Sequence, residues 1–119
     1  MKIEIIAEIA QGYEGDQKLT DLLTTGALMS GADAVKYQLV YADELATPDY
    51  LHYSLFRSLE MPIGIWEEIS KRVHDAEQKL YFDVFGFDSL VIAHEIGADG
   101  VKLSTTEFYN RSLIEKALG

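Results

Sequence analysis

The sequence contains no cysteine, only two prolines and half as many basic as acidic residues. Without cysteine, a disulfide scaffold and thiolate metal sites are excluded, and we expect a cytoplasmic location. Ten Lys and Arg against 20 Asp and Glu give a formal net charge of −10 at pH 7. This balance argues against nucleic acid as a partner, because few cations are available to neutralise a phosphate backbone. A small anionic ligand remains compatible, since lysines focused in a cleft locally outweigh a distant acidic surface.

Long apolar runs are also lacking, so no segment is expected to cross a bilayer. The N-terminal apolar stretch includes Glu4 and is not followed by a small-residue cleavage site, and we therefore expect no signal peptide. Hydrophobic residues make up 48% and charged residues 25% of the 119 positions, as in ordinary globular proteins. We expect one domain over residues 1–119, with no membrane partner.

One six-residue phrase occurs twice, as Gly-Ala-Asp-Ala-Val-Lys at residues 31–36 and as Gly-Ala-Asp-Gly-Val-Lys at residues 97–102. Each copy follows a helix-like stretch, and glycine suits a helix end because it adopts left-handed conformations. On the strand expected at residues 34–38, alternation places Lys36 and Gln38 on one face. Polar residues at the end of such a strand are typical of a barrel strand that opens on a site. The alternative is that Lys36 and Lys102 simply extend into solvent.

The spacing of apolar residues predicts four β-α units. Strands are expected at residues 3–7, 34–38, 80–85 and after the second phrase, and helices at 18–30, about 50–60, 63–78, 88–96 and 111–118. Asp16 is a candidate N-cap, and Trp66 is expected in the core. Strands that alternate with helices indicate a parallel sheet. Because an eight-stranded barrel needs about 250 residues, we expect an α/β fold that is half of a TIM (β/α)8 barrel. The alternative is an open sheet with helices on both faces.

Polar residues gather where these strands are expected to end, which is where parallel α/β folds place their sites. They are Glu8, Lys36, Gln38, Asp83, Lys102, Ser104, Thr105, Thr106 and Glu107. Two lysines with nearby hydroxyls suit a phosphate or a carboxylate. The two glutamates suit sugar hydroxyls or proton transfer. The structural alternative is that both glutamates pair with the lysines.

Metal and nucleophile motifs are weak in this chain. His52, His74 and His94 lack a paired ligand spacing, and we expect them at the surface or in packing. We therefore predict no metal site within these residues. The sequence also shows no Ser-His-Asp order, no glycine-rich phosphate loop and no dinucleotide fingerprint.

Several stretches, in order, resemble the sialic acid (N-acetylneuraminate) synthase family. Residues 5–10 resemble its Glu-Ile-Gly element, and residues 31–38 resemble its Gly-Ala-Asp-Ala-Val-Lys-Phe-Gln element. Residues 42–48 are similar to its Ala-x-x-Leu-x-x-Pro loop. Residues 59–62 are similar to the Leu-Glu-Leu-Pro segment that precedes its next helix. Residues 101–104 are similar to the start of its Tyr-Lys-Ile-x-Ser-Gly-Glu element. The resemblance covers nearly the whole chain.

The resemblance implies a transferase of carbohydrate biosynthesis, in which a β/α barrel condenses phosphoenolpyruvate with an N-acetylmannosamine-like aldose. By position, Lys36 and Lys102 would hold the phosphate and carboxylate of phosphoenolpyruvate, with Gln38 beside them. Thr105 occupies the position of a family serine. Glu107 occupies that of a glutamate near the reacting centre, and Glu8 would contact the sugar.

The chain departs from the family pattern in two of its loops. Gly-Tyr-Glu-Gly at residues 12–15 lacks the usual Asn and His, and Asp83-Val84-Phe85-Gly86 replaces Ser-Thr-Pro-Phe. A carboxylate at Asp83 therefore stands where a hydroxyl would contact the ligand. The divalent metal that the family implies, Mn or Mg, takes its ligands from the second half of the barrel, and a C-terminal antifreeze-like domain follows; this chain contains neither.

We therefore expect the N-terminal half of such a barrel, as a fragment or truncated product that is inactive alone. A homodimer or the missing C-terminal half would cover its open edges. Two alternatives remain open at this point. One is an aldolase that forms a Schiff base through Lys102, and the other is a non-catalytic interaction half-barrel.

Overall fold

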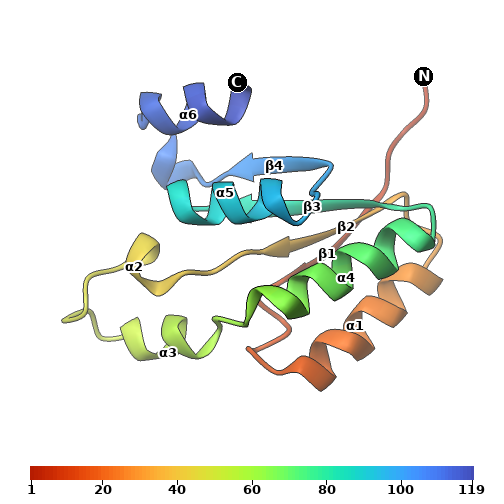
Figure 1. Cartoon of the computed structure of the whole chain (residues 1–119), viewed down its shortest axis with the longest axis horizontal. Helices are drawn as coiled ribbons and strands as arrows, with labels where there is room; N and C mark the ends of the chain where they lie inside the picture. Colours follow the sequence, from red (N-terminus) through yellow and green to blue (C-terminus); the bar gives the residue numbers. More distant parts are fainter.

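Four parallel strands form one sheet in the computed structural model, which describes all 119 residues (Figure 1). The strands β1 (Ile6–Ala10), β2 (Ala34–Gln38), β3 (Lys79–Val84) and β4 (Gly100–Leu103) are adjacent in sequence order. Helix α1 (Gln17–Met29) joins β1 to β2, and α5 (Phe87–Glu95) joins β3 to β4. Between β2 and β3 lie α2 (Ala42–Leu45), α3 (Tyr53–Ser58) and α4 (Ile63–Asp75), and η1 (Thr105–Glu107) and α6 (Arg111–Leu118) follow β4. The expected α/β fold of four β-α units is confirmed.

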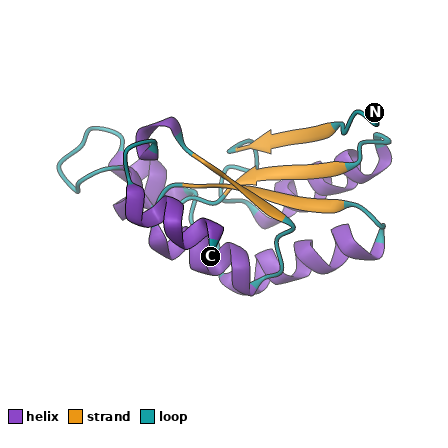
Figure 2. Ribbon diagram, turned by 90° about the horizontal axis from the view of Figure 1, so that it is seen from above, coloured by secondary structure: helices purple, strands orange, loops and turns teal.

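The helices cover one face of the sheet and leave the other bare, as Figure 2 shows. Val35, Tyr37, Leu80 and Phe82 point from β2 and β3 into a core that the helices close. The residues that alternate with them, such as Lys36, lie on the uncovered face. The alternative of an open sheet with helices on both faces is therefore wrong, and the layering is that of half a barrel. None of the helices combines the length and apolar character needed to cross a membrane.

Four aromatic rings fill the centre of the core, from Tyr13, Tyr37, Trp66 and Phe82, all at most 1% exposed. Trp66 meets the other three rings edge-on, with centroids 5.2–5.4 Å apart, a favourable geometry for aromatic pairs. The Tyr13 hydroxyl donates to the Gln38 carbonyl at 2.8 Å. Burial raises the pKa of Tyr37 to about 12. Tyr13, in the loop that lacks the Asn and His of the resembled pattern, therefore fills the core.

Most element boundaries agree with the sequence predictions, and β2 and α6 agree at both ends. Asp16 caps α1 as predicted, accepting the Leu19 N–H at 2.8 Å. The strand predicted at residues 3–7 is wrong in position, because the parallel ladder with β2 begins only at Ile6. Glu8 therefore lies inside β1 instead of after it. Helix α4 ends at Asp75, three residues before the prediction, since Glu77 adopts a left-handed φ of 57°.

The predicted helix at about residues 50–60 is shorter in the structure, and a second helix precedes it. Helix α3 covers only Tyr53–Ser58, whereas α2 was expected to be a loop. The Glu44 carboxylate on α2 accepts the Ser89 N–H at the start of α5 at 3.0 Å. A carboxylate at a helix N-terminus is favourable, so this contact holds the four-residue α2 in place.

The repeated phrase has the same structural role in both copies. Gly31 and Gly97 end α1 and α5 with φ near 80°, which glycine adopts without strain. Asp33 exchanges two hydrogen bonds with the backbone of Ile5, and Asp99 does the same with Leu80. Each aspartate thus ties the start of its strand to the neighbouring strand. The aspartates of the phrase are structural, and its lysines lie further along the strand.

We expect Asp99→Ala to destabilise the fold in a pH-dependent way. Partial burial opposes ionisation, but the Leu80 N–H and the His74 imidazole, each 2.8 Å away, hold the pKa of Asp99 below its usual 3.8. A lowered folded pKa adds stability above the unfolded pKa, and this stability is lost as pH falls through the folded value. Urea unfolding should show a deficit of about 1 kcal/mol at pH 7 that shrinks below about pH 4. A deficit that stays constant from pH 7 to pH 3 would contradict this assignment.

Candidate functional site

A row of four charged side chains crosses the uncovered face, one from each strand. Glu8 on β1, Lys36 on β2, Asp83 on β3 and Lys102 on β4 alternate in sign. We call them the charged row. Lys36 Nζ lies 3.5 Å from Glu8 Oε2 and 3.3 Å from Asp83 Oδ1. Lys102 Nζ donates to Asp83 Oδ2 at 3.1 Å. The strand register produces this order, because Glu8 lies opposite Lys36 and Asp83 opposite Lys102.

Asp83 is the most deeply buried member of the row. Its side chain is 4% exposed, against 17% for Lys36 and 58% for Lys102. A buried carboxylate requires a cationic partner to offset its desolvation, and Asp83 has two. Its Oδ1 atom faces Lys36 without hydrogen-bond geometry, so this contact is purely ionic. At the edge of the row, burial raises the pKa of Glu8, and the Lys36 charge opposes that rise.

A hollow of about 220 Å³ lies on this face beside the two lysines. It is lined by Ile6, Lys36, Tyr81, Gly100, Val101 and Lys102. A Cβ at Gly100 would lie 3.1 Å from the ring of Tyr81, so glycine keeps that space open. The first copy of the phrase has Ala34 at the corresponding position.

The other predicted site residues lie at the same end of the sheet without joining the row. Gln38 lies opposite Asp83 and is half-buried. The Thr106 hydroxyl donates a hydrogen bond to Ser104 Oγ at 3.0 Å, and Thr105 is exposed at the start of η1. Glu107 is half-buried in η1, and no ion pair joins it to either lysine. The alternative in which both glutamates pair with lysines therefore holds for Glu8 only.

Tyr81 and Glu4 belong to this face and were not predicted. The Tyr81 hydroxyl donates to Glu4 at 2.6 Å, and Lys79 lies 3.0 Å from the same carboxylate. The signal for Tyr81 was present, because period-two alternation places residues 79, 81 and 83 on one face. Nothing in the sequence indicated that Glu4, which precedes β1, reaches across to β3.

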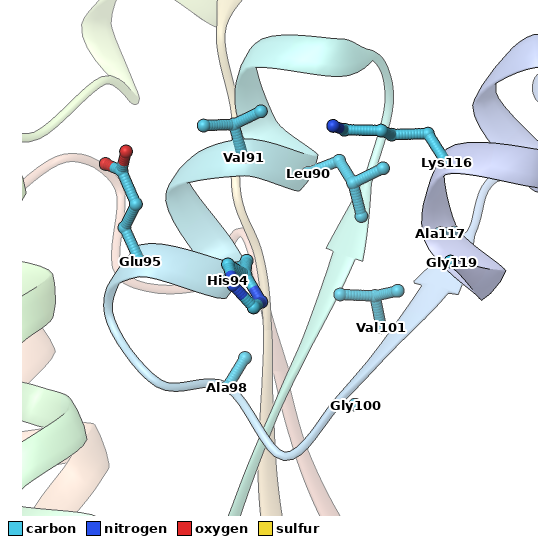
Figure 3. A pocket seen from close by; sticks show the side chains of 10 residues that line it. All are labelled: Leu90, Val91, His94, Glu95, Ala98, Gly100, Val101, Lys116, Ala117 and Gly119. Atoms are coloured by element: carbon cyan, nitrogen blue, oxygen red, sulfur yellow. The ribbon is translucent and has the colours of Figure 1, made fainter.

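A larger cavity of about 580 Å³ lies elsewhere, between α5 and α6 beside the edge strand β4 (Figure 3). Figure 3 shows Leu90 and Val91 of α5 on one side and Lys116 of α6 on the other. None of the predicted site residues lines it. We therefore place the candidate site at the smaller hollow, where the charged groups converge.

The residues of this chain do not fit the divalent metal that the family resemblance implies. No group of three or more His, Asp or Glu side chains lies close enough together to hold a metal ion. The two carboxylates of the charged row already face lysines.

An arrangement of Ser70, His74 and Asp99 lies on α4 and before β4, but Ser70 is buried and donates to the Ile96 carbonyl at 2.6 Å. It therefore packs the helix and is no activated nucleophile.

Solved structures share this fold, although no protein-family model and no curated protein matches the sequence. N-acetylneuraminic acid (sialic acid) synthetase from Leptospira borgpetersenii, crystallised with citrate, superposes with a TM-score of 0.86 at 21% identity over 97% of this chain. A spore coat polysaccharide biosynthesis protein E of Chromobacterium violaceum gives 0.77 at 16% identity over 97%. The spore coat polysaccharide biosynthesis protein SpsE of Bacillus subtilis gives 0.68 at 26% identity over 88% of this chain.

The matches confirm the predicted fold at the level of architecture. This chain corresponds to 41%, 38% and 30% of the three matched chains, so it spans less than half of each. Its four β-α units match the N-terminal part of the sialic acid synthase barrel. The similar structures are named as proteins of sialic acid and spore coat polysaccharide biosynthesis.

We expect unequal effects on stability when the charged row is truncated. Asp83→Ala leaves the largely buried Lys36 with only Glu8 as a partner, which should cost about 3 kcal/mol. Lys102→Ala removes a half-exposed partner and should cost no more than about 1 kcal/mol. Urea unfolding of the two variants and the unmodified chain at one pH measures the difference. Equal losses would show that Asp83 is not the centre of the row.

Proposed function

We propose that this chain, which has the fold of the N-terminal part of a sialic acid synthase barrel, provides half of a phosphoenolpyruvate-condensing site. The observation that carries the proposal is the convergence of Lys36 and Lys102 on one hollow at the uncovered face. In the proposed reaction, the enol carbon of phosphoenolpyruvate bonds to the aldehyde carbon of an N-acetylmannosamine-like aldose. Water adds at the phosphate-bearing carbon, and phosphate leaves.

The residues of the site divide by chemistry. Lys36 and Lys102 would bind the phosphate and carboxylate, since ammonium groups form charge-assisted hydrogen bonds with such anions. Gln38, Ser104 and Thr105 would add neutral donors beside them. Glu8, whose pKa is raised by burial, would contact the sugar.

Glu107, beyond the end of β4, would stand near the reacting centre. Because this chain offers no metal ligands, the Mn or Mg ion of the proposed reaction would be held by residues outside it. We therefore expect binding, and no turnover, from these 119 residues alone. The cytoplasmic location stays a prediction.

Calorimetric titration with phosphoenolpyruvate tests the anion site. We expect measurable binding to the unmodified chain and a loss of at least about tenfold in Lys36→Met and in Lys102→Met. Lys71→Met is the matched control, because Lys71 pairs with Asp75 at an exposed position on α4 and should leave binding unchanged. No binding by the unmodified chain would instead favour a non-catalytic interaction half-barrel.

The geometry does not favour the alternative of a Schiff-base aldolase. A Schiff base forms from a neutral amine, which enzymes obtain by desolvation or by a second cation nearby. Lys102 is half-exposed and donates to the Asp83 carboxylate, which stabilises its ammonium form.

We also propose that two copies of the chain associate. Strands β1 and β4 are both free edges, which invite pairing with another strand. Ile6, Phe108 and Tyr109 are exposed near these edges, Tyr109 at 92%. Two four-stranded halves supply the eight strands that a closed barrel requires.

Light scattering measures this association directly. We expect the solution mass of a dimer at micromolar concentration, and Ile6→Asp should shift the mass toward the monomer, because a buried edge rejects an unpaired charge. Leu22→Asp, at an exposed position on α1, is the control. A monomeric unmodified chain would rule out self-association as the way these edges are covered.

A further inference from the structure

The Asp83 carboxylate lies between the two cations that define the candidate anion site. Its Oδ1 atom is 3.3 Å from Lys36 Nζ, and its Oδ2 atom is 3.1 Å from Lys102 Nζ. A phosphate or carboxylate bound to both lysines would place its own oxygens in the same positions. The charged row contains two carboxylates and two ammonium groups, so it carries no net positive charge to offer an incoming anion.

We infer that Asp83 is a built-in counter-ion that sets the affinity of this site for anions. The inference rests on the proposed function, since it concerns the same lysines. An anion that enters the hollow must either draw Lys102 away from Asp83 or approach a buried carboxylate of like charge. Both cost free energy in a partly buried site, where charges are weakly screened. The unmodified chain therefore binds small anions weakly.

The two lysines differ in their freedom to respond to a ligand. Lys36 is largely buried between Glu8 and Asp83, so it keeps its place. Lys102 is 58% exposed on the edge strand β4, and its ammonium group can turn from Asp83 toward a ligand in the hollow. Asp83 itself is fixed, because its backbone carbonyl accepts the Leu39 N–H at 3.0 Å and its side chain is enclosed.

Two substitutions at Asp83 test the inference by calorimetric titration with inorganic phosphate and with phosphoenolpyruvate. Asp83→Asn keeps the shape and a hydrogen-bond acceptor while it removes the charge. Asp83→Ser removes the charge and adds a hydroxyl that can donate to an anion. We expect both variants to bind both anions at least tenfold more tightly than the unmodified chain. The control Asp75→Ser removes one negative charge from an exposed position on α4 and should leave the affinity unchanged.

The possible outcomes separate this inference from the proposed function. If the two Asp83 variants bind anions more tightly and Asp75→Ser does not, the result supports both the anion site and the counter-ion role of Asp83. If the unmodified chain binds and the Asp83 variants bind no more tightly, the counter-ion role is wrong while the anion site stands. If neither the unmodified chain nor the variants bind, the anion site itself is wrong. Equal tightening in Asp75→Ser would show an effect of overall charge and would overturn the role of Asp83.

A measurement on the unmodified chain covers the case in which the variants do not fold. The carboxyl carbon of Asp83 can be followed by NMR during a titration with phosphate, alongside that of Asp75. An anion that competes for the lysines should shift the Asp83 resonance and leave the Asp75 resonance in place. Saturable phosphate binding at the lysines without a shift at Asp83 would contradict the inference.

Discussion

The contact between Lys36 and Asp83 constrains the whole sheet, because both side chains are largely buried and a buried charge requires an opposite charge beside it. The pair spans β2 and β3, and Glu8 and Lys102 extend it to the two edge strands. A slip of one residue in any strand would turn one member of the row into the apolar core. The row therefore specifies the register of all four strands on the face that no helix covers.

The repeated phrase serves the two ends of each strand in different ways. Asp33 and Asp99 tie the strand starts to neighbouring backbone, and the lysine three residues later reaches the charged row. Lys36 lies opposite Tyr81 and Lys102 opposite Asp83, so Lys102 lies two residues further along β3, and the two lysines reach Asp83 from the strands on either side of it. The repeat in sequence therefore reflects a repeat in how the two strands begin, whereas the two cations converge through their shared contact with Asp83.

The sequence predicted the parts of the fold that local signals determine, and it missed the parts that depend on distant contacts. β2, α6 and the Asp16 cap follow from alternation, helical spacing and cap chemistry, which are all local. The four-residue α2 depends on Glu44 meeting Ser89, 45 residues away. The gathering of polar residues at one end of the sheet could be predicted because the strand ends of parallel sheets lie together, but the pairing of Asp83 with both lysines depends on strand register, which no single segment encodes.

The same carboxylate that stabilises the sheet opposes the proposed ligand. Without Asp83, Lys36 would lie largely buried with only Glu8 at 3.5 Å to offset its charge, and Lys102 would add a second cation to the same face. A site made only of lysines gains anion affinity and loses stability until a ligand arrives. Asp83 reverses that balance, as expected where stability and binding compete for the same charges. In the proposed site, the carboxylate of Asp83 therefore stabilises the uncovered face in the absence of a ligand and opposes the binding of an anion.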